Sequence, residues 1–175
     1  MDAYFLETAM EVIDLRSFSN LWFWIALGTV WSAASYRAVG VPVDLLRRAL
    51  DGDAVALHDT VVLADVHARR MIHIADASGL ALTAIGTFAL TVLLVLALIY
   101  GVEFAQAVAL LVVPLALVGG LALATARRVV VTPPEDVAPL LIRHRRIVQA
   151  LGFVSVFATS LWGMWSNLNA NVLGV

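Results

Sequence analysis

Four long segments of the chain contain no charged residue and are rich in aliphatic side chains. They are residues Ser17–Tyr36, Ala77–Val102, Phe104–Ala126 and Ile147–Val175. An uncharged apolar segment of about 20 residues is typical of a transmembrane helix, because ~30 Å of hydrocarbon requires that length at ~1.5 Å per residue. We therefore predict an all-α polytopic membrane protein. Its four transmembrane helices lie at about residues 18–38, 78–100, 104–126 and 147–167 and pack as a compact bundle.

The composition agrees with this interpretation. The chain is 62% hydrophobic with a mean hydropathy of +0.93, whereas a soluble domain has about 45–50% apolar residues. Four spans use about half of the 175 residues, so we predict a single membrane domain over residues 1–175. The absence of lysine beside abundant alanine, valine and leucine suggests a GC-rich bacterial genome.

The arginines predict the orientation of the spans. Ten of the eleven basic residues, all arginine, lie in the segments Arg37–Asp76 and Arg127–Arg146. The positive-inside rule places the loops at about 39–77 and 127–146 in the cytoplasm and both termini in the periplasm. The aromatic residues of the predicted outer interface agree, since amphipathic rings prefer that level; they are Trp22, Trp24, Tyr100, Trp162 and Trp165.

Short helices are also expected outside the spans. Residues 3–16 have an apolar face opposite an acidic one, which predicts an interfacial anchor or, alternatively, an acidic docking face for a periplasmic partner. In the first loop, Pro42 suits a first helical turn, Asp51-Gly52 is a stop signal, and a second helix runs from Asp53 into the second span. In the second loop, Thr132 and Glu135 predict a capping box.

Each predicted span carries small or hydroxyl residues at a spacing of four. Such stripes let helix backbones approach closely and indicate a compact bundle or an oligomer. A hydroxyl-lined ion path is the weaker alternative, because Thr in a membrane helix usually bonds its own backbone. The predicted packing residues are Gly28, Ser32, Thr83, Thr87, Thr91, Ala116, Gly120, Ala124, Ser155, Thr159 and Gly163.

The sequence contains little that predicts chemistry. The chain has no cysteine, and its net charge of −2 gives no electrostatic basis for binding nucleic acid. One stretch of the first loop gathers metal-ligand types, but without the His–His spacing of a helical metal site; its weak candidates are His58, Asp65, His67, His73 and Asp76. We therefore predict no catalytic residue, no metal and no cofactor.

Three arginines in the second loop are a candidate contact surface. Arg143, Arg145 and Arg146 have no acidic residue nearby in the sequence, unlike the arginines of the first loop. They precede the fourth span, at the level of the cytoplasmic headgroups, where each cation contributes ~1 kcal/mol against an anionic leaflet. A lipid headgroup or another protein would contact them.

Three segments carry a resemblance to a known family. The stretches VIDLRSFSNLWFWIALGTVWSAASYRAVGVPVDLL, YGVEFAQA and WGMWSNL are similar to those of small alphaproteobacterial membrane proteins described as "component of SufBCD complex". The similarity covers nearly the whole chain. It implies a link to cytosolic iron–sulfur cluster assembly proteins, and a chain without cysteine would serve as a tether there, because it could not hold a cluster by thiolates.

These observations favour a non-enzymatic subunit, scaffold or assembly factor of a membrane-associated complex in the bacterial inner membrane. Proton relays and ion pumps place ionisable residues at membrane depth, and the four apolar segments contain no Asp, Glu, Lys or Arg. Other membrane subunits or further copies of the chain are the expected partners. The alternative is a small homo-oligomeric transporter or channel.

Overall fold

The computed structural model describes residue 18 and residues 20–172, and the predicted interfacial helix at 3–16 lies outside them. The described chain is helical apart from two paired strands of two residues each. The elements in order are α2 (Leu21–Tyr36), β1 (Arg37–Ala38), β2 (Val41–Pro42), α3 (Val43–Leu50), α4 (Ala54–Leu98), α5 (Glu103–Val129) and α6 (Pro134–Val172).

Three of these helices are long and apolar enough to cross a membrane: α4, α5 and, over Pro134–Leu168, α6. The chain therefore has the structure expected of a membrane protein. The helix α2 has 16 residues, or ~24 Å at ~1.5 Å per residue, which is short of ~30 Å of hydrocarbon. The predicted continuity of the second helix of the first loop with the second span is confirmed, since α4 is one helix of 45 residues.

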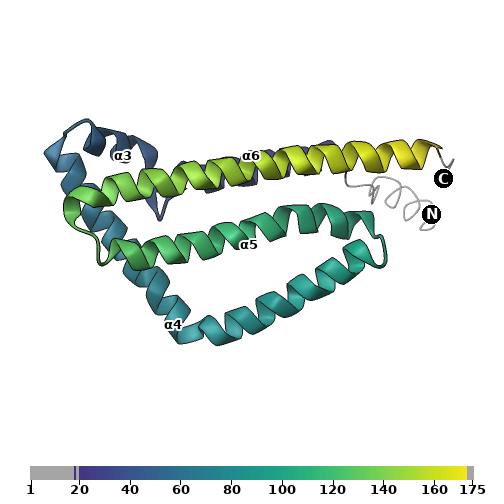
Figure 1. Ribbon diagram of the computed structural model, residues 1–175, viewed down its shortest axis with the longest axis horizontal. Helices are drawn as coiled ribbons and strands as arrows, with labels where there is room; N and C mark the ends of the chain where they lie inside the picture. Colours follow the sequence, from purple (N-terminus) through teal and green to yellow (C-terminus); the bar gives the residue numbers. More distant parts are fainter. Residues whose placement is uncertain (1–17, 19, 173–175) are drawn as a thin grey trace, which may run out of the picture.

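The molecule is elongated (Figure 1), and its two ends differ in composition. One end, which we call the arginine end, is formed by α3, the first half of α4, the end of α5 and the start of α6. The other, which we call the Glu103 end, contains the start of α2, the turn between α4 and α5 and the late part of α6. Figure 1 shows α4 bent partway along its length. Ser78-Gly79 lies at the middle of α4, and Gly/Ser pairs are a known cause of helix bends.

The buried core lies at the arginine end. One face of α4 carries Ala56, Thr60, Ala64 and Ala68 at a spacing of four, and all four residues are 0% exposed. We call these residues the alanine stripe. Its alanines belong to one apolar cluster with Leu46 of α3 and Leu141 of α6. Small side chains allow the neighbouring helices to approach closely, so this face holds α3, α4 and α6 together.

A hairpin between α2 and α3 completes this core and was not predicted from the sequence. Its strands pair Arg37 with Pro42 and Ala38 with Val41. The two turn residues, Val39 and Gly40, have φ angles of 49° and 82°, as a type I′ turn requires. A β-branched residue rarely adopts a positive φ. Val39 is only 4% exposed, so its burial in the core offsets that strain.

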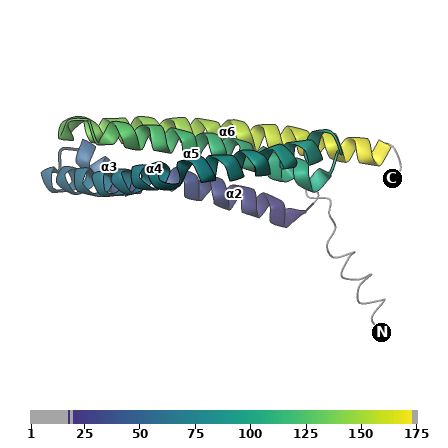
Figure 2. The ribbon, with the colours of Figure 1, turned by 90° about the horizontal axis from the view of Figure 1, so that it is seen from below.

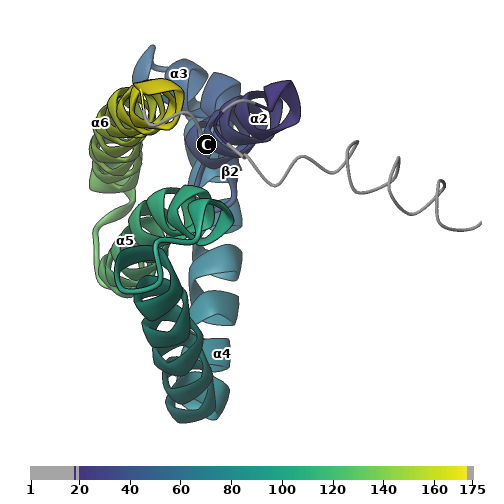
Figure 3. The same cartoon turned by 90° about the vertical axis from the view of Figure 1, so that its right-hand side faces the viewer.

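Outside this core, the helices pack less closely. The helix α2 runs beside α6 in the opposite direction (Figures 2 and 3). Two glycines of α6 allow this approach. A Cβ built on Gly152 would lie 2.7 Å from the Trp31 ring of α2, and one on Gly163 would lie 3.1 Å from the ring of Phe18, which precedes α2. Within the most apolar 18-residue windows of α4, α5 and α6, only 6%, 11% and 28% of residues are buried.

Candidate functional site at the arginine end

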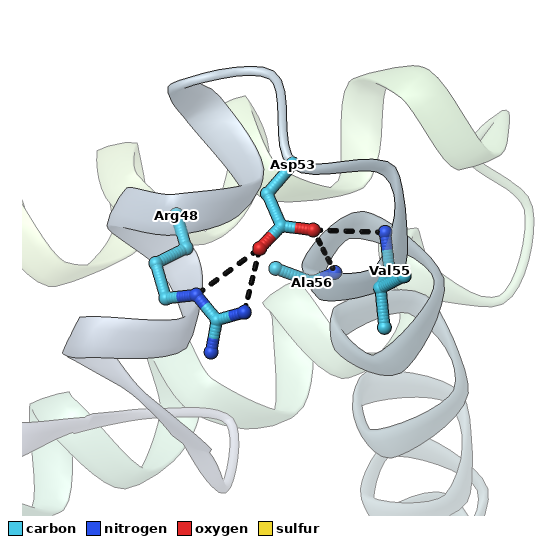
Figure 4. Close-up of polar contacts among 4 residues, drawn as sticks. All are labelled: Arg48, Asp53, Val55 and Ala56. Atoms are coloured by element: carbon cyan, nitrogen blue, oxygen red, sulfur yellow. Dashed lines mark hydrogen bonds and ion pairs between the residues drawn. The ribbon is translucent and has the colours of Figure 1, made fainter.

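The junction between α3 and α4 fixes the direction in which α4 leaves the core (Figure 4). After the turn at Asp51-Gly52, which ends α3 as predicted and holds Gly52 at φ 94°, Asp53 caps α4. Its Oδ1 accepts hydrogen bonds from the backbone N–H groups of Val55 and Ala56 at 3.0 and 3.1 Å. Its Oδ2 accepts from Arg48 Nη2 at 2.6 Å. Asp53 therefore ties the end of α3 to the start of α4.

The turn between α5 and α6 differs from the prediction. Helix α6 begins at Pro134, one residue later than the predicted capping box requires. The hydroxyl of Thr132 donates to the carbonyl of Arg128 at 2.7 Å, so it satisfies the C-terminal end of α5 instead of the N-terminal end of α6. The predicted capping box is wrong because either of two consecutive prolines can occupy the first helical position.

A buried polar contact joins α5 to α6 just beyond this turn. Thr125 and His144 are 5% exposed each, and Thr125 Oγ1 lies 3.0 Å from His144 Nδ1. The threonine hydroxyl donates its single hydrogen to the Leu121 carbonyl at 2.8 Å, so it accepts from His144, whose proton is thereby placed on Nδ1. Nothing in the sequence pattern singles out this pair, because its two residues lie 19 positions apart in the chain, on different helices.

The three arginines predicted as a contact surface have two different environments. Arg145 Nε donates to the Ser35 carbonyl at 3.1 Å, in the last turn of α2, where a cation also interacts favourably with the helix dipole. Arg145 therefore connects α6 to α2. Arg143 and Arg146 are exposed, and neither forms an ion pair with any described residue. They remain a candidate contact surface for lipid or protein.

The weak metal candidates are not brought together. Asp65 accepts two hydrogen bonds from Arg69 at 3.0 and 2.9 Å, and the ring of His67 lies within 2.5 Å of a Cβ built on Gly40. His58, His73 and Asp76 are exposed along α4. Among the described residues, no group of three or more His, Asp or Glu side chains could hold a metal ion.

The face of α4 opposite the alanine stripe carries three exposed valines, which we call the valine stripe. Val55, Val62 and Val66 are 67%, 49% and 58% exposed. Their spacings of 7 and 4 place them in one line on the helix, flanked by Asp59 on one side and Arg69 on the other. Unlike the apolar residues of the spans, they share their helix segment with charged side chains. The spacing of these valines can be read from the sequence, but their exposure to the surroundings cannot.

The predicted packing stripes are distributed unequally. On α6, Ser155, Thr159 and Gly163 are buried. The other predicted packing residues are exposed in this chain, so their packing against other chains stays a prediction. They are Gly28, Ser32, Thr83, Thr87, Thr91, Ala116, Gly120 and Ala124. As expected for membrane helices, hydroxyls bond their own backbone, with Thr87 Oγ1 2.7 Å from the Thr83 carbonyl and Thr91 Oγ1 2.8 Å from the Thr87 carbonyl.

Comparisons with protein-family models, with curated proteins and with solved structures find no match to this chain. The functional interpretation therefore depends on the geometry of the arginine end and on the sequence.

Asp53 provides a test of how the arginine end is held together. The hydrogen bond from the Ala56 N–H, followed by that from Arg48, lowers the pKa of Asp53 below its ordinary value of 3.8. A lowered pKa means that the carboxylate stabilises the folded state above pH ~3.8, and that this contribution is lost as the pH falls through the lowered pKa. Thermal melting in mild detergent should therefore show a stronger acid dependence for the wild type than for Asp53→Asn.

The matched control is Asp59→Asn, since Asp59 is exposed on the same helix and takes part in no ion pair with a described residue. This variant should keep the acid dependence of the wild type. An equal loss of acid dependence in both variants would show that Asp53 has no special part in it.

Proposed function

We propose that this chain is a non-enzymatic subunit of the bacterial inner membrane that acts as a scaffold or assembly factor in a membrane-associated complex. The observation that carries the proposal is the valine stripe, an exposed apolar line on a helix segment that also contains Asp59, Asp65, Arg69 and Arg70. Such a charged segment does not lie in hydrocarbon. An exposed apolar stripe in water indicates an interaction surface.

In this proposal the chain crosses the membrane four times, with α2 as the first span. The contacts of α2 and of Phe18, which precedes it, extend along α6 from Arg145 to Gly163, a distance of ~27 Å at ~1.5 Å per residue. The backbone N–H of Phe18 also donates to Glu103 Oε1 at 3.0 Å. The pairing of α2 with a span over nearly the whole hydrocarbon thickness supports its own role as a span.

The arginine end faces the cytoplasm and both termini lie in the periplasm. The support for this orientation is the separation of residue types along the molecule. The arginines Arg47, Arg70, Arg127, Arg143 and Arg146 belong to the elements of the arginine end. The predicted interface aromatics belong to the Glu103 end, where Trp162 Nε1 donates to Gln106 Oε1 at 3.1 Å. This arrangement satisfies the positive-inside rule.

Cysteine accessibility tests this topology directly. The chain has no native cysteine, so each introduced cysteine is the only thiol of the chain that can be labelled. Ala54→Cys, at the start of α4, should react with a membrane-impermeant maleimide only after the inner membrane is permeabilised. Gly174→Cys should react in intact spheroplasts. Labelling of both positions from the same side would contradict the four-span topology.

The valine stripe and the neighbouring charges then form a docking face for a partner helix. Opposite the stripe, the alanine stripe is fully buried, so α4 is held rigidly while its other face remains available. Apolar anchors at helical spacing with charged flanks are typical of helix-in-groove recognition. By resemblance, the partners in the cytoplasm are iron–sulfur cluster assembly proteins, to which this chain would serve as a membrane tether.

A small homo-oligomeric transporter or channel is the alternative, and no contact described above favours it. The hydroxyls of Thr87 and Thr91 bond to their own helix. Their hydrogens are therefore unavailable to donate to a passing anion.

Purification of the full chain from its native membrane in mild detergent tests the scaffold proposal. We expect a heteromeric complex of fixed stoichiometry. The double variant Val62→Asp/Val66→Asp should lower the retained partner by roughly tenfold or more, because anchors at the centre of an interface contribute most of its affinity. The control Val131→Asp, at another exposed position of the arginine end (79% exposed), should retain the partner. Ion or solute flux through the pure protein in liposomes would contradict the proposal.

A further inference from the structure

The spanning helices enclose an apolar pocket at the Glu103 end. Its volume is about 410 Å³, which lies within the range of ligand pockets. The late part of α4 contributes Leu94, the first half of α5 contributes Leu110 and Pro114, and α6 contributes Val154. On α6 the wall is open to the surroundings, since Val154 is 62% exposed.

Every polar side chain in the lining is already engaged. Ser155 Oγ donates to the Leu151 carbonyl at 2.7 Å. Gln106 Nε2 donates to the Ala97 carbonyl at 3.0 Å, and Gln106 Oε1 accepts from Trp162 Nε1 at 3.1 Å. These two bonds form a clasp that joins α4, α5 and α6 at one edge of the pocket. A polar ligand would therefore find only the second N–H of the Gln106 amide and spare lone pairs on oxygens that already take part in hydrogen bonds.

From this geometry we propose that the pocket binds one acyl chain of a membrane glycerophospholipid. The chain lies between α5 and α6, and the headgroup lies beyond the clasp of Gln106 and Trp162. An apolar cavity at membrane depth is filled by hydrocarbon, and dispersion contacts with the lining hold the chain there, because no water is displaced. Trp162 is 41% exposed, and tryptophan prefers the level where chains meet headgroups.

The lining distinguishes an acyl chain from the head of an isoprenoid quinone. A quinone ring requires donors for its carbonyl oxygens and a titratable group to supply protons on reduction. The lining contains no Asp, Glu, His, Lys or Arg, and its amide, indole and hydroxyl groups are bonded to one another or to the backbone. An acyl chain requires none of these groups.

Photo-crosslinking tests the proposal with the full chain in vesicles of phosphatidylethanolamine and phosphatidylglycerol. The probe is a trace of phosphatidylcholine with a diazirine in its acyl chain. Crosslinks located by peptide mass spectrometry should concentrate at Leu110, Val113 and Val154. They should be weaker at Leu80 and Phe88 of α4, which are 89% and 71% exposed but lie outside the pocket.

A matched pair of substitutions separates specific binding from general contact with lipid. Ala158 is an exposed residue of the pocket wall, and Ala150 is an exposed residue of the same helix outside this wall. Ala158→Phe should lower the pocket crosslinks by roughly tenfold, a loss of ~1.4 kcal/mol, and Ala150→Phe should leave them unchanged. Circular dichroism and the elution volume verify that both variants fold.

Three results would overturn the proposal. One is an even distribution of wild-type crosslinks over all exposed residues of α4, α5 and α6, which needs no variant to interpret. Another is an equal effect of the two substitutions. The third is a quinone, instead of a phospholipid, bound to the purified protein in stoichiometric amount. None of these results bears on the valine stripe, so the scaffold proposal would stand or fall separately.

Discussion

The close approach of α4 to its neighbours at the alanine stripe is the contact on which the rest of the structure depends. Ala56, Thr60, Ala64 and Ala68 are fully buried, and their small side chains let α3, α6 and the hairpin pack against one face of a single helix. Dispersion and the exclusion of water stabilise this core, because its part of α4 lies outside the apolar segments that could span a membrane. In lipid no equivalent hydrophobic force brings helices together, so the spanning parts depend on this core for their alignment.

This dependence explains why the two halves of the molecule differ. The hairpin and the bond from Arg145 to the Ser35 carbonyl hold the C-terminal end of α2 in place. The Thr125–His144 contact joins the end of α5 to the first part of α6. Beyond these points the spans share few buried residues. They enclose an apolar pocket and leave small-residue faces uncovered. An anchored end with loosely packed spans suits a protein whose proposed role is to assemble with lipids and other subunits.

Local signals made some of these features predictable. Charge-free segments located three helices long enough to span, and Asp51-Gly52 located the turn that separates α3 from α4. The hairpin was missed because Val39 adopts a positive φ, which the sequence disfavours at a β-branched residue and which only burial offsets. The alanine stripe was missed because hydropathy does not distinguish a buried alanine from an exposed one. The bond of Arg145 to α2 was missed because its partner, the Ser35 carbonyl, lies 110 residues away in the chain.

The thermal stability of Ala64→Leu in mild detergent tests the central role of the alanine stripe most directly. Three added carbon atoms at a residue with 0% exposure should separate α4 from its neighbours and lower the free energy of unfolding by about 1–3 kcal/mol. The same substitution at Ala81, which is exposed on the spanning half of α4, should change it little. We expect a clear fall in melting temperature for Ala64→Leu alone, and equal melting temperatures for the two variants would show that the alanine stripe does not hold the helices together.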